Sequence, residues 1–289
     1  MADDELNPVV GIDLGTTYSA ISRWAGDRPV AYNLVGGQTL PSIVYIQEGG
    51  APLVGKYARQ KLIIDPPNSV QRAKRFMDDD NKVFNLRGKE YTPVDVSAMI
   101  LARLREEVES KYPSAAGFEF AGAIVTHPHY FKYPQIARTK EAAEEAGLPI
   151  IRLLSEPVAA AICYGFEQYK NLDEERSEKL LIFDLGGGTF DVTVLEVINE
   201  LNKLTFRVLS VGGDDMLGGT NFDEEFMKWA LEEAKIDLAS ADETTRDRSQ
   251  AKLLEAAIEA KEQLSHIEEV FLAVPSILPG QHLDMEVPR

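Results

Sequence analysis

The order of apolar and polar residues predicts strands and helices in alternation along the chain. Apolar runs rich in β-branched residues predict strands, which begin near residues 9, 20, 122, 181, 192 and 206. Apolar residues recurring every three to four positions predict helices at 96–112, 134–146, 158–169, 222–234 and 251–264. Strands and helices mixed in this way indicate an α/β protein.

One pattern occurs twice. Residues 9–18 and 181–190 each contain an apolar run, then Asp-Leu-Gly, then a hydroxyl residue and an aromatic residue, and each copy continues into another β-prone run. Strand, tight glycine turn and strand is the structure expected for both. The copies are separated by more than half of the chain, so they predict two related lobes. The polar segment 170–179 is the expected crossing between the lobes, and 237–248 is expected to be an exposed connection between helices.

The two turns are candidate phosphate-binding sites. Gly15 allows a ligand to approach the backbone, while Thr16 and Thr17 offer N–H and hydroxyl donors. A single turn of this kind is explained more simply as a polar β-hairpin. The second copy has three glycines, residues 186–188, and glycine costs up to about 1 kcal/mol in ordered structure. A close ligand is therefore the better interpretation. Facing turns would hold a di- or triphosphate, with Asp13 and Asp184 converging on hydrated Mg²⁺.

Four other features can each be read in two ways. Glu156 begins a helix after Ser155, and it is equally suited to capping that start and to a metal shell. Lys74 is most simply a surface charge. The glycines at 218 and 219 suit a phosphate or ribose, or a plain loop. Lys261 and Ser265 share one helix face, for which solvent contact is the simpler interpretation.

Composition excludes several classes of protein. The formal charge of −17 argues against broad binding of nucleic acid or anionic lipid. A single cysteine, Cys163, excludes an intrachain disulfide, and the scattered histidines form no zinc motif. The apolar runs are too short to span a bilayer, and the start is acidic, unlike a signal sequence. We expect a cytoplasmic protein without nucleic-acid or membrane partners.

Several motifs together resemble the ATPase domain of the seventy-kilodalton heat-shock chaperone family. They are residues 11–19, 73–75, 155–165, 182–192 and 217–223, in the family's order and approximate spacing over essentially the whole chain. The resemblance implies an actin-like ATPase fold, with duplicated ribonuclease H-like lobes around a nucleotide cleft. It also implies hydrolysis of ATP to ADP and phosphate by a chaperone that assists protein folding in the stress response.

The resemblance assigns a role to each matching residue. The implied catalytic residues are Lys74, which helps to position the attacking water, and Glu156, Asp184, Thr189 and Asp191. The implied Mg²⁺ residues are Asp13, Glu156 and Asp184, and K⁺ is a further candidate ion. The implied ATP or ADP contacts are Gly15, Thr16, Thr17, Tyr18, Gly186, Gly187, Gly188, Gly218, Gly219, Lys261 and Ser265.

The resemblance also sets expectations for domains and partners. Residues 1–172 are expected to form lobe I and residues 173–289 an incomplete lobe II. The family continues past this point with a second adenosine loop, a closing helix, a linker and a peptide-binding domain. We therefore expect a fragment or a natural truncation, without the peptide-binding domain and with weak or no activity. Unfolded clients, a J-domain co-chaperone and a nucleotide exchange factor are the partners expected for the full-length protein.

The chain departs from the family at three places. The segment at 129–136, with Tyr133 and Ile136, differs where the family couples the ATPase to its linker and co-chaperones, so that coupling is left open. The resemblance implies that the helix with Lys261 and Ser265 binds adenosine, and Ile258 stands there in place of the family's glutamate. The contact with adenosine is then weaker unless Glu259 substitutes. The segment between Lys74 and Tyr91 is shorter, which predicts a reduced subdomain.

Two other functions are compatible with the same fold. A sugar or acetate kinase would need an acceptor pocket with a catalytic acid, and no segment can be nominated for one. A nucleotide-regulated scaffold of the actin type would need no catalysis. The segments around Lys74 and Glu156 favour the chaperone.

Overall fold

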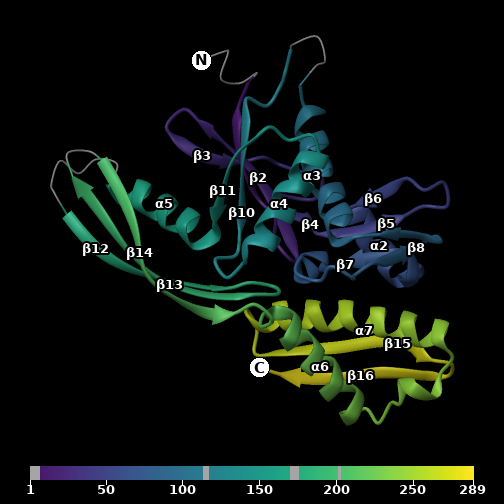
Figure 1. Ribbon diagram of the computed structural model, residues 1–289. Coiled ribbons are helices and arrows are strands. Elements are labelled where there is room, and N and C mark those ends of the chain that lie inside the picture. Colours follow the sequence, from purple (N-terminus) through teal and green to yellow (C-terminus); the bar gives the residue numbers. More distant parts are fainter. Residues whose placement is uncertain (1–6, 113–116, 170–175, 201–202) are drawn as a thin grey trace.

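The computed structural model describes residues 7–112, 117–169, 176–200 and 203–289 and shows a mixed α/β protein (Figure 1). Its N-terminal part is built on a six-stranded sheet. The strands are β1 (Val9–Asp13), β2 (Tyr18–Ala25), β3 (Arg28–Ala31), β4 (Leu40–Pro41), β10 (Gly122–His127) and β11 (Ile150–Ser155). Their order is β11-β10-β1-β2-β3, and β4 pairs with β2. The first glycine turn therefore joins two central, antiparallel strands.

Helices α3 (Pro93–Glu109) and α4 (Tyr133–Glu145) pack against each other and against this sheet. Alternate residues of β1, Val10 and Ile12, are almost fully buried in the same core as Leu101 and Leu104 of α3. Helix α3 begins after Thr92, whose hydroxyl accepts a hydrogen bond from the Asp95 N–H in a capping box. The core thus fixes the strand that ends at Asp13.

A smaller sheet with its helix follows β4. It contains β5 (Ile43–Ile46), β6 (Pro52–Val54) and β7 (Ser69–Gln71), with α2 (Lys56–Ile64) packed on it. Two short 3₁₀ helices, η1 (Pro66–Asn68) and η2 (Ala73–Phe76), and the hairpin β8 (Phe84–Leu86) with β9 (Lys89–Tyr91) complete this region. Helix α2 was not predicted, because its buried residues are only Ala58 and Leu62 and its apolar periodicity is weak.

Helix α5 (Glu156–Tyr169) lies between the six-stranded sheet and a second, antiparallel sheet (Figure 1). The second sheet has the order β12-β13-β14, from β12 (Arg176–Leu185), β13 (Phe190–Glu200) and β14 (Lys203–Asp214). The strand–turn–strand structure predicted for the second motif is confirmed. The predicted crossing at 170–179 is partly wrong, because residues 176–179 already belong to β12, and residues 170–175 lie outside the described residues.

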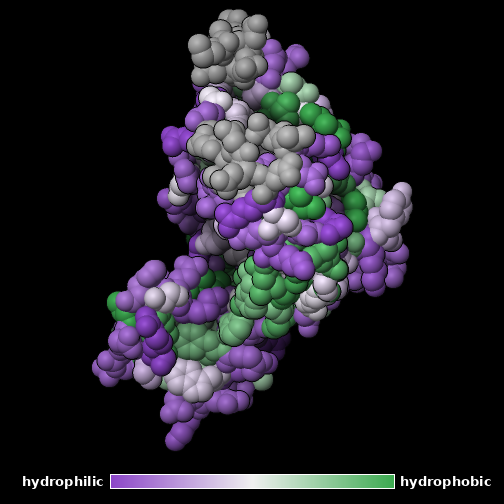
Figure 2. All heavy atoms as spheres, turned by 90° about the vertical axis from the view of Figure 1, so that its left-hand side faces the viewer, coloured by the Kyte–Doolittle hydropathy of each residue, from purple (hydrophilic) through white to green (hydrophobic). Residues whose placement is uncertain are grey.

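The β12–β14 sheet exposes apolar side chains on the face away from α5. Leu181 and Phe183 are each 65% exposed and Leu185 is 45% exposed. Figure 2 shows the side of the molecule that lies on the left in Figure 1, and hydrophobic surface gathers there below the centre of the view. Among the described residues, no strand pairs with the outer edge of β12, whereas the corresponding edge of β1 pairs with β10.

The C-terminal part consists of α6 (Gly219–Glu233), a 3₁₀ turn η4 (Leu238–Ser240), α7 (Glu243–Leu264) and the hairpin β15 (Glu269–Leu278) with β16 (Gln281–Pro288). Much of the predicted connection at 237–248 is instead helical. Asp242 caps α7 by accepting the Thr245 N–H at 3.0 Å, so the helix starts eight residues before its apolar pattern does. Helix α7 lies across from α2 and η1 of the N-terminal part (Figure 1).

Candidate functional site

The first glycine turn is held tightly by its neighbours. The Ser42 hydroxyl donates to the Gly15 carbonyl at 2.8 Å, and the Ser42 N–H donates to the Thr17 carbonyl at 2.8 Å. A Cβ on Gly15 would lie 2.0 Å from the Tyr18 carbonyl oxygen. The turn therefore requires glycine at this position, and Ser42, which the sequence did not single out, supports it.

The second turn packs directly on the first. A Cβ on Gly187 would lie 1.9 Å from Thr17 Oγ1, and one on Gly188 would lie 2.7 Å from Thr16 Cγ2. The prediction explained the three glycines at 186–188 by a close ligand. In the structure a close protein contact excludes a Cβ at Gly187 and Gly188, whereas a Cβ on Gly186 would meet its nearest atom, the Thr189 carbonyl oxygen, at 3.4 Å. The two predicted phosphate turns do face each other, as the repeated pattern implied.

A third glycine segment completes the group. The Gly219 N–H donates to the Gly186 carbonyl and the Thr220 N–H to the Gly187 carbonyl, both at 2.9 Å. A Cβ on Gly218 would lie 2.5 Å from the Gly188 nitrogen. The start of α6 is thus joined to the second turn through backbone contacts. We call residues 15–17, 186–188 and 218–220 the three turns.

A cavity of about 270 Å³ lies beside the three turns and between the N- and C-terminal parts. Polar and apolar side chains both contribute to its wall. The lining residues are Thr16, Thr17, Tyr18, Ser42, Ile43, Gln71, Arg72, Leu185, Gly186, Gly187, Gly219, Thr220, Asp223, Ile258, Lys261 and Glu262. Lys261 of the predicted helix face is therefore part of the cavity, as is Ile258. Ser265 is not among these lining residues and instead caps the C-terminal end of α7.

Lys74 is buried, not the surface charge that its sequence context suggested. Its side chain is 6% exposed, and its Nζ lies 2.8 Å from Glu156 Oε1. The same ammonium lies 5.6 Å from the centre of the Phe131 ring. Phe131 is itself buried and stacks with the His127 ring, and burial lowers the pKa of that histidine. The lysine is thus fixed by a carboxylate and an aromatic ring.

Three carboxylates gather at the strand ends next to this lysine. Burial, and then the negative charge of Asp13, raises the pKa of Asp184. Burial also raises the pKa of Glu156, with further contributions from Asp13 and Asp184, despite the opposing effect of Lys74. Asp13 in addition accepts a hydrogen bond from the Thr126 hydroxyl at 3.0 Å. The structure therefore brings the three predicted metal residues into one neighbourhood.

The donor chemistry of this neighbourhood suits Mg²⁺ bound through water. Within the described residues, no three His, Cys, Asp or Glu side chains stand close enough to hold an ion directly. Mg²⁺ keeps several waters and needs few protein ligands, and a cation would offset the repulsion among the carboxylates. Asp13, Glu156 and Asp184 consequently fit the outer shell of a hydrated ion.

Asp191 lies on β13, the strand next to β12, and is paired directly with Asp184. It is 1% exposed, its Oδ1 has no hydrogen-bond partner, and burial followed by Asp184 raises its pKa. Backbone N–H groups of His129 and Tyr130 oppose that shift. Thr189 closes the second turn through its carbonyl, which accepts the Gly186 N–H at 2.9 Å.

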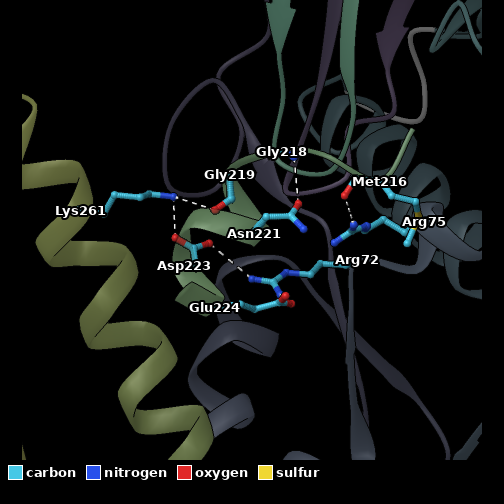
Figure 3. Close-up of polar contacts among 9 residues, drawn as sticks. All are labelled: Arg72, Arg75, Met216, Gly218, Gly219, Asn221, Asp223, Glu224 and Lys261. Atoms are coloured by element: carbon cyan, nitrogen blue, oxygen red, sulfur yellow. Dashed lines mark hydrogen bonds and ion pairs between the residues drawn. The ribbon is translucent and has the colours of Figure 1, made fainter. Parts of the chain in front are cut away.

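Arginines of the N-terminal part make polar contacts with the C-terminal part that were not predicted from the sequence. Arg72 contacts Asp223, and Arg75 Nη2 donates to the Met216 carbonyl at 2.6 Å (Figure 3). Arg59 Nε lies 2.7 Å from Glu255 Oε2. Arg59 also donates to the Tyr18 hydroxyl at 3.1 Å. Charged residues so far apart in sequence can be paired only once the fold is known.

The segment that departs from the family pattern takes two different environments. Tyr133 begins α4 and is 83% exposed, whereas Ile136 packs against the main core.

None of the described helices combines the length and apolar character needed to cross a membrane.

The chain was compared with models of known protein families. The family described as "Hsp70 protein" matches residues 9–289, which include all three turns, Lys74, Glu156 and the cavity. A match over nearly the whole length shows the family. The chain belongs to the Hsp70 family.

Proposed function

We propose that this chain is the ATP-binding and ATP-hydrolysing domain of a heat-shock chaperone. The observation that carries the proposal is the buried Lys74–Glu156 pair, at 2.8 Å, beside the carboxylates at the ends of β1 and β12. A buried lysine held by one acid and next to unbalanced negative charge is a typical active-site arrangement. These groups do not line the cavity themselves, but Thr16, Thr17, Leu185 and Gly186, which follow Asp13 and Asp184 in the chain, do. Family membership supports the same assignment.

We propose further that residues 1–172 and 173–289 form the two lobes of an actin-like ATPase fold. The antiparallel pairs β1–β2 and β12–β13 support a duplicated origin, since each ends in an aspartate near a glycine turn. The cavity would then be the nucleotide site between the lobes.

The three turns would bind the phosphates of ATP. Thr16, Thr17 and the N–H groups of Gly15, Gly187 and Gly188 would donate hydrogen bonds. Tyr18 and Lys261 would contact the rest of the nucleotide. Ser265 would join them only if the end of α7 moved, because it is not part of the cavity wall. Asp13, Glu156 and Asp184 would hold the waters of Mg²⁺, which when bound neutralises phosphate charge.

Hydrolysis would be an in-line transfer of the terminal phosphoryl group to water. Positioning and charge neutralisation supply most of the catalysis in such reactions. The Lys74 ammonium, fixed by Glu156 and Phe131, would orient the attacking water. Thr189 and Asp191 would lie on the γ-phosphate side, at the second turn. In the full-length protein, we propose that this cycle controls binding of unfolded clients under co-chaperone control.

The test is binding and turnover of ATP by this chain, with and without Mg²⁺, beside the variant Lys74→Met. Because a water-positioning group acts mainly in the transition state, we expect at least about a hundredfold loss of phosphate release. The dissociation constant for ATP should change by less than about threefold. Lys228→Met, at an exposed lysine, is the matched control and should behave as the wild type. Equal loss of binding and turnover in Lys74→Met would contradict the assigned role.

A further inference from the structure

Arg72 is a cation of the N-terminal part that lines the cavity. Its side chain is only 17% exposed, and its guanidinium points toward the C-terminal part (Figure 3). The other cation among the lining residues is Lys261, which comes from α7. The cavity therefore offers an anionic ligand one cation from each part of the chain.

The backbone of Arg72 has an unusual conformation. The residue precedes η2 with φ of 62°, in the left-handed region. This region is unfavourable for a residue with a Cβ, and such outliers gather at functional sites. The same 3₁₀ helix carries Lys74, the candidate catalytic lysine. The unfavourable conformation thus occurs where the side chain reaches the proposed nucleotide site.

The carboxylates near Arg72 compensate its charge only in part. Asp223 Oδ2 lies 3.5 Å from Nη2, and Glu224 Oε1 lies 3.5 Å from Nη1. Both distances exceed the about 2.7–2.9 Å of a strong charge-assisted hydrogen bond. Asp223 also contacts Lys261, at 2.5 Å, and the Glu224 side chain is 51% exposed. Burial, with a contribution from the charge of Arg75, accordingly lowers the pKa of Arg72 despite the two acids.

The guanidinium has donors left for a ligand. It carries five N–H groups in one plane, and the contacts with the two acids use one on each Nη. A phosphate group accepts two parallel N–H donors from an arginine, so it can bind beside the carboxylates without displacing them. Thr16, Gly187 and Gly219 of the three turns line the same cavity as Arg72. A phosphate chain at these turns is therefore in the same cavity as the guanidinium.

We propose that Arg72 binds the phosphate chain of the nucleotide from the N-terminal side of the cavity. This inference rests on the proposed function, because it adds a phosphate-binding residue to the same site. The phosphates supply the negative charge that Asp223 and Glu224 supply only in part. Arg72 is then an affinity-determining residue for nucleoside di- and triphosphates, with a role separate from that of Lys74.

The experiment is titration calorimetry of ADP and of inorganic pyrophosphate, each with Mg²⁺, against the whole chain and two variants. Arg72→Gln removes the charge and should weaken binding of both ligands at least about tenfold, because hydrogen bonds between charged groups are strong. Arg72→Lys keeps the charge but not the planar fork, so the loss should be smaller, about threefold. Thermal melting establishes that each variant is folded.

The matched control and the salt dependence separate a charged contact from a structural disturbance. Arg207→Gln, at an exposed arginine that pairs with Glu196 on the β12–β14 sheet, should bind as the wild type does. Lowering the ionic strength from about 0.15 M to about 0.01 M lengthens the Debye length from about 8 Å to about 30 Å. The loss caused by Arg72→Gln should therefore be larger at the lower ionic strength. Displacement of the three turns would weaken binding by the same factor at both.

Each remaining outcome counts against the proposal. A loss for ADP without a loss for pyrophosphate would place the arginine at the base or ribose and overturn the inference. A loss that is the same at both ionic strengths would make the effect structural and also overturn it. If the wild-type chain binds ADP and Arg72→Gln binds it equally well or more tightly, the inference alone fails. If the wild type binds neither ADP nor ATP, the proposed function fails with it.

Discussion

At the scale of single residues, the surroundings of Lys74 are marked by charges that are buried without full compensation. Lys74 has one acid partner at 2.8 Å, while Glu156, Asp184 and Asp191 all have raised pKa values with burial as the main cause. Such groups reduce the stability of the folded chain at neutral pH, because a buried charge loses its hydration. Sites of this kind are retained for chemistry and not for stability.

Asp191→Asn tests this conflict between stability and function. Because the folded-state pKa of Asp191 is raised, the folded chain keeps this proton to a higher pH than the unfolded chain does. The wild type therefore loses stability as pH rises from the unfolded pKa, about 3.9, through the folded pKa. We expect the unfolding free energy of the variant minus that of the wild type to increase between pH 4 and pH 8. Loss of a hydrogen bond at the side-chain amide that Asp191→Asn introduces would change the unfolding free energy by the same amount at every pH, so it cannot produce this trend.

Urea denaturation followed by circular dichroism, in metal-free buffer at several pH values, measures this difference. Asp284→Asn, at an exposed position with the same chemical change, should show no such trend. A difference that instead shrinks as pH rises would mean that the Asp191 carboxylate is stabilising when charged.

At the scale of elements, the site depends on three turns that pack directly on one another. The start of α6 is joined to the β12–β13 turn by two N–H to carbonyl hydrogen bonds of 2.9 Å, and that turn packs on Thr16 and Thr17. Strand ends and a helix start are thereby held at fixed relative positions. The N–H groups of Gly15, Gly187 and Gly188 are among the groups proposed to bind phosphate.

Gly218→Ala should separate α6 from the second turn. Its backbone is extended, with φ of −178°, so alanine is not strained in itself, but the new Cβ would lie 2.5 Å from the Gly188 nitrogen. Overpacking of this kind costs about 1–3 kcal/mol of unfolding free energy. Displacement of the turns should also weaken ATP binding by at least about tenfold.

The matched control is Gly212→Ala, whose Cβ would meet its nearest neighbour, the Tyr130 hydroxyl, at an ordinary 3.8 Å. Thermal melting and calorimetry on both variants separate the two effects. Equal stability and ATP affinity for Gly218→Ala and Gly212→Ala would show that the three turns tolerate a looser arrangement.

At the scale of the whole molecule, the chain consists of two parts that bury their apolar residues to different degrees. The N-terminal sheet is covered by α3 and α4 and has a large buried core. The β12–β14 sheet is covered by α5 on one face, and on the other it exposes Leu181, Phe183 and Leu185. A row of exposed apolar residues beside an unpaired strand edge favours association between molecules.

We expect this chain to self-associate in a concentration-dependent way through β12, and Phe183→Lys to reduce it. A lysine on an exposed edge strand opposes strand addition and removes an exposed aromatic ring. The matched control is Phe271→Lys on β15, where the phenylalanine is 61% exposed but is flanked by Glu269 and Ala273. Sedimentation velocity over a range of concentrations measures the effect. A wild-type chain that stays monomeric at high concentration, or equal effects of both variants, would contradict this prediction.

The sequence by itself determined the features that depend on local order. The period of apolar residues identified α3, α4, α5, α6 and the later part of α7, and the repeated Asp-Leu-Gly pattern located both glycine turns. It did not locate the start of α7, because that end depends on the cap at Asp242 and on few apolar residues. Helix α2 was missed for a similar reason, since its stability comes from packing on β5 and α7.

Only the tertiary structure decided how charged residues are used. Lys74, Arg72 and Asp223 look like surface charges in the sequence, because the sequence does not show whether a side chain is buried or which opposite charge it meets. Glu156 and Asp223 become the partners of Lys74 and Lys261 through contacts between segments more than thirty residues apart. The glycine turns were located correctly by sequence, yet the close contacts that exclude a Cβ at Gly187, Gly188 and Gly218 come from the neighbouring turns and exist only in the folded chain. Hydrophobic periodicity is a local property and survives in the sequence, whereas pairing of buried charges is a property of the fold.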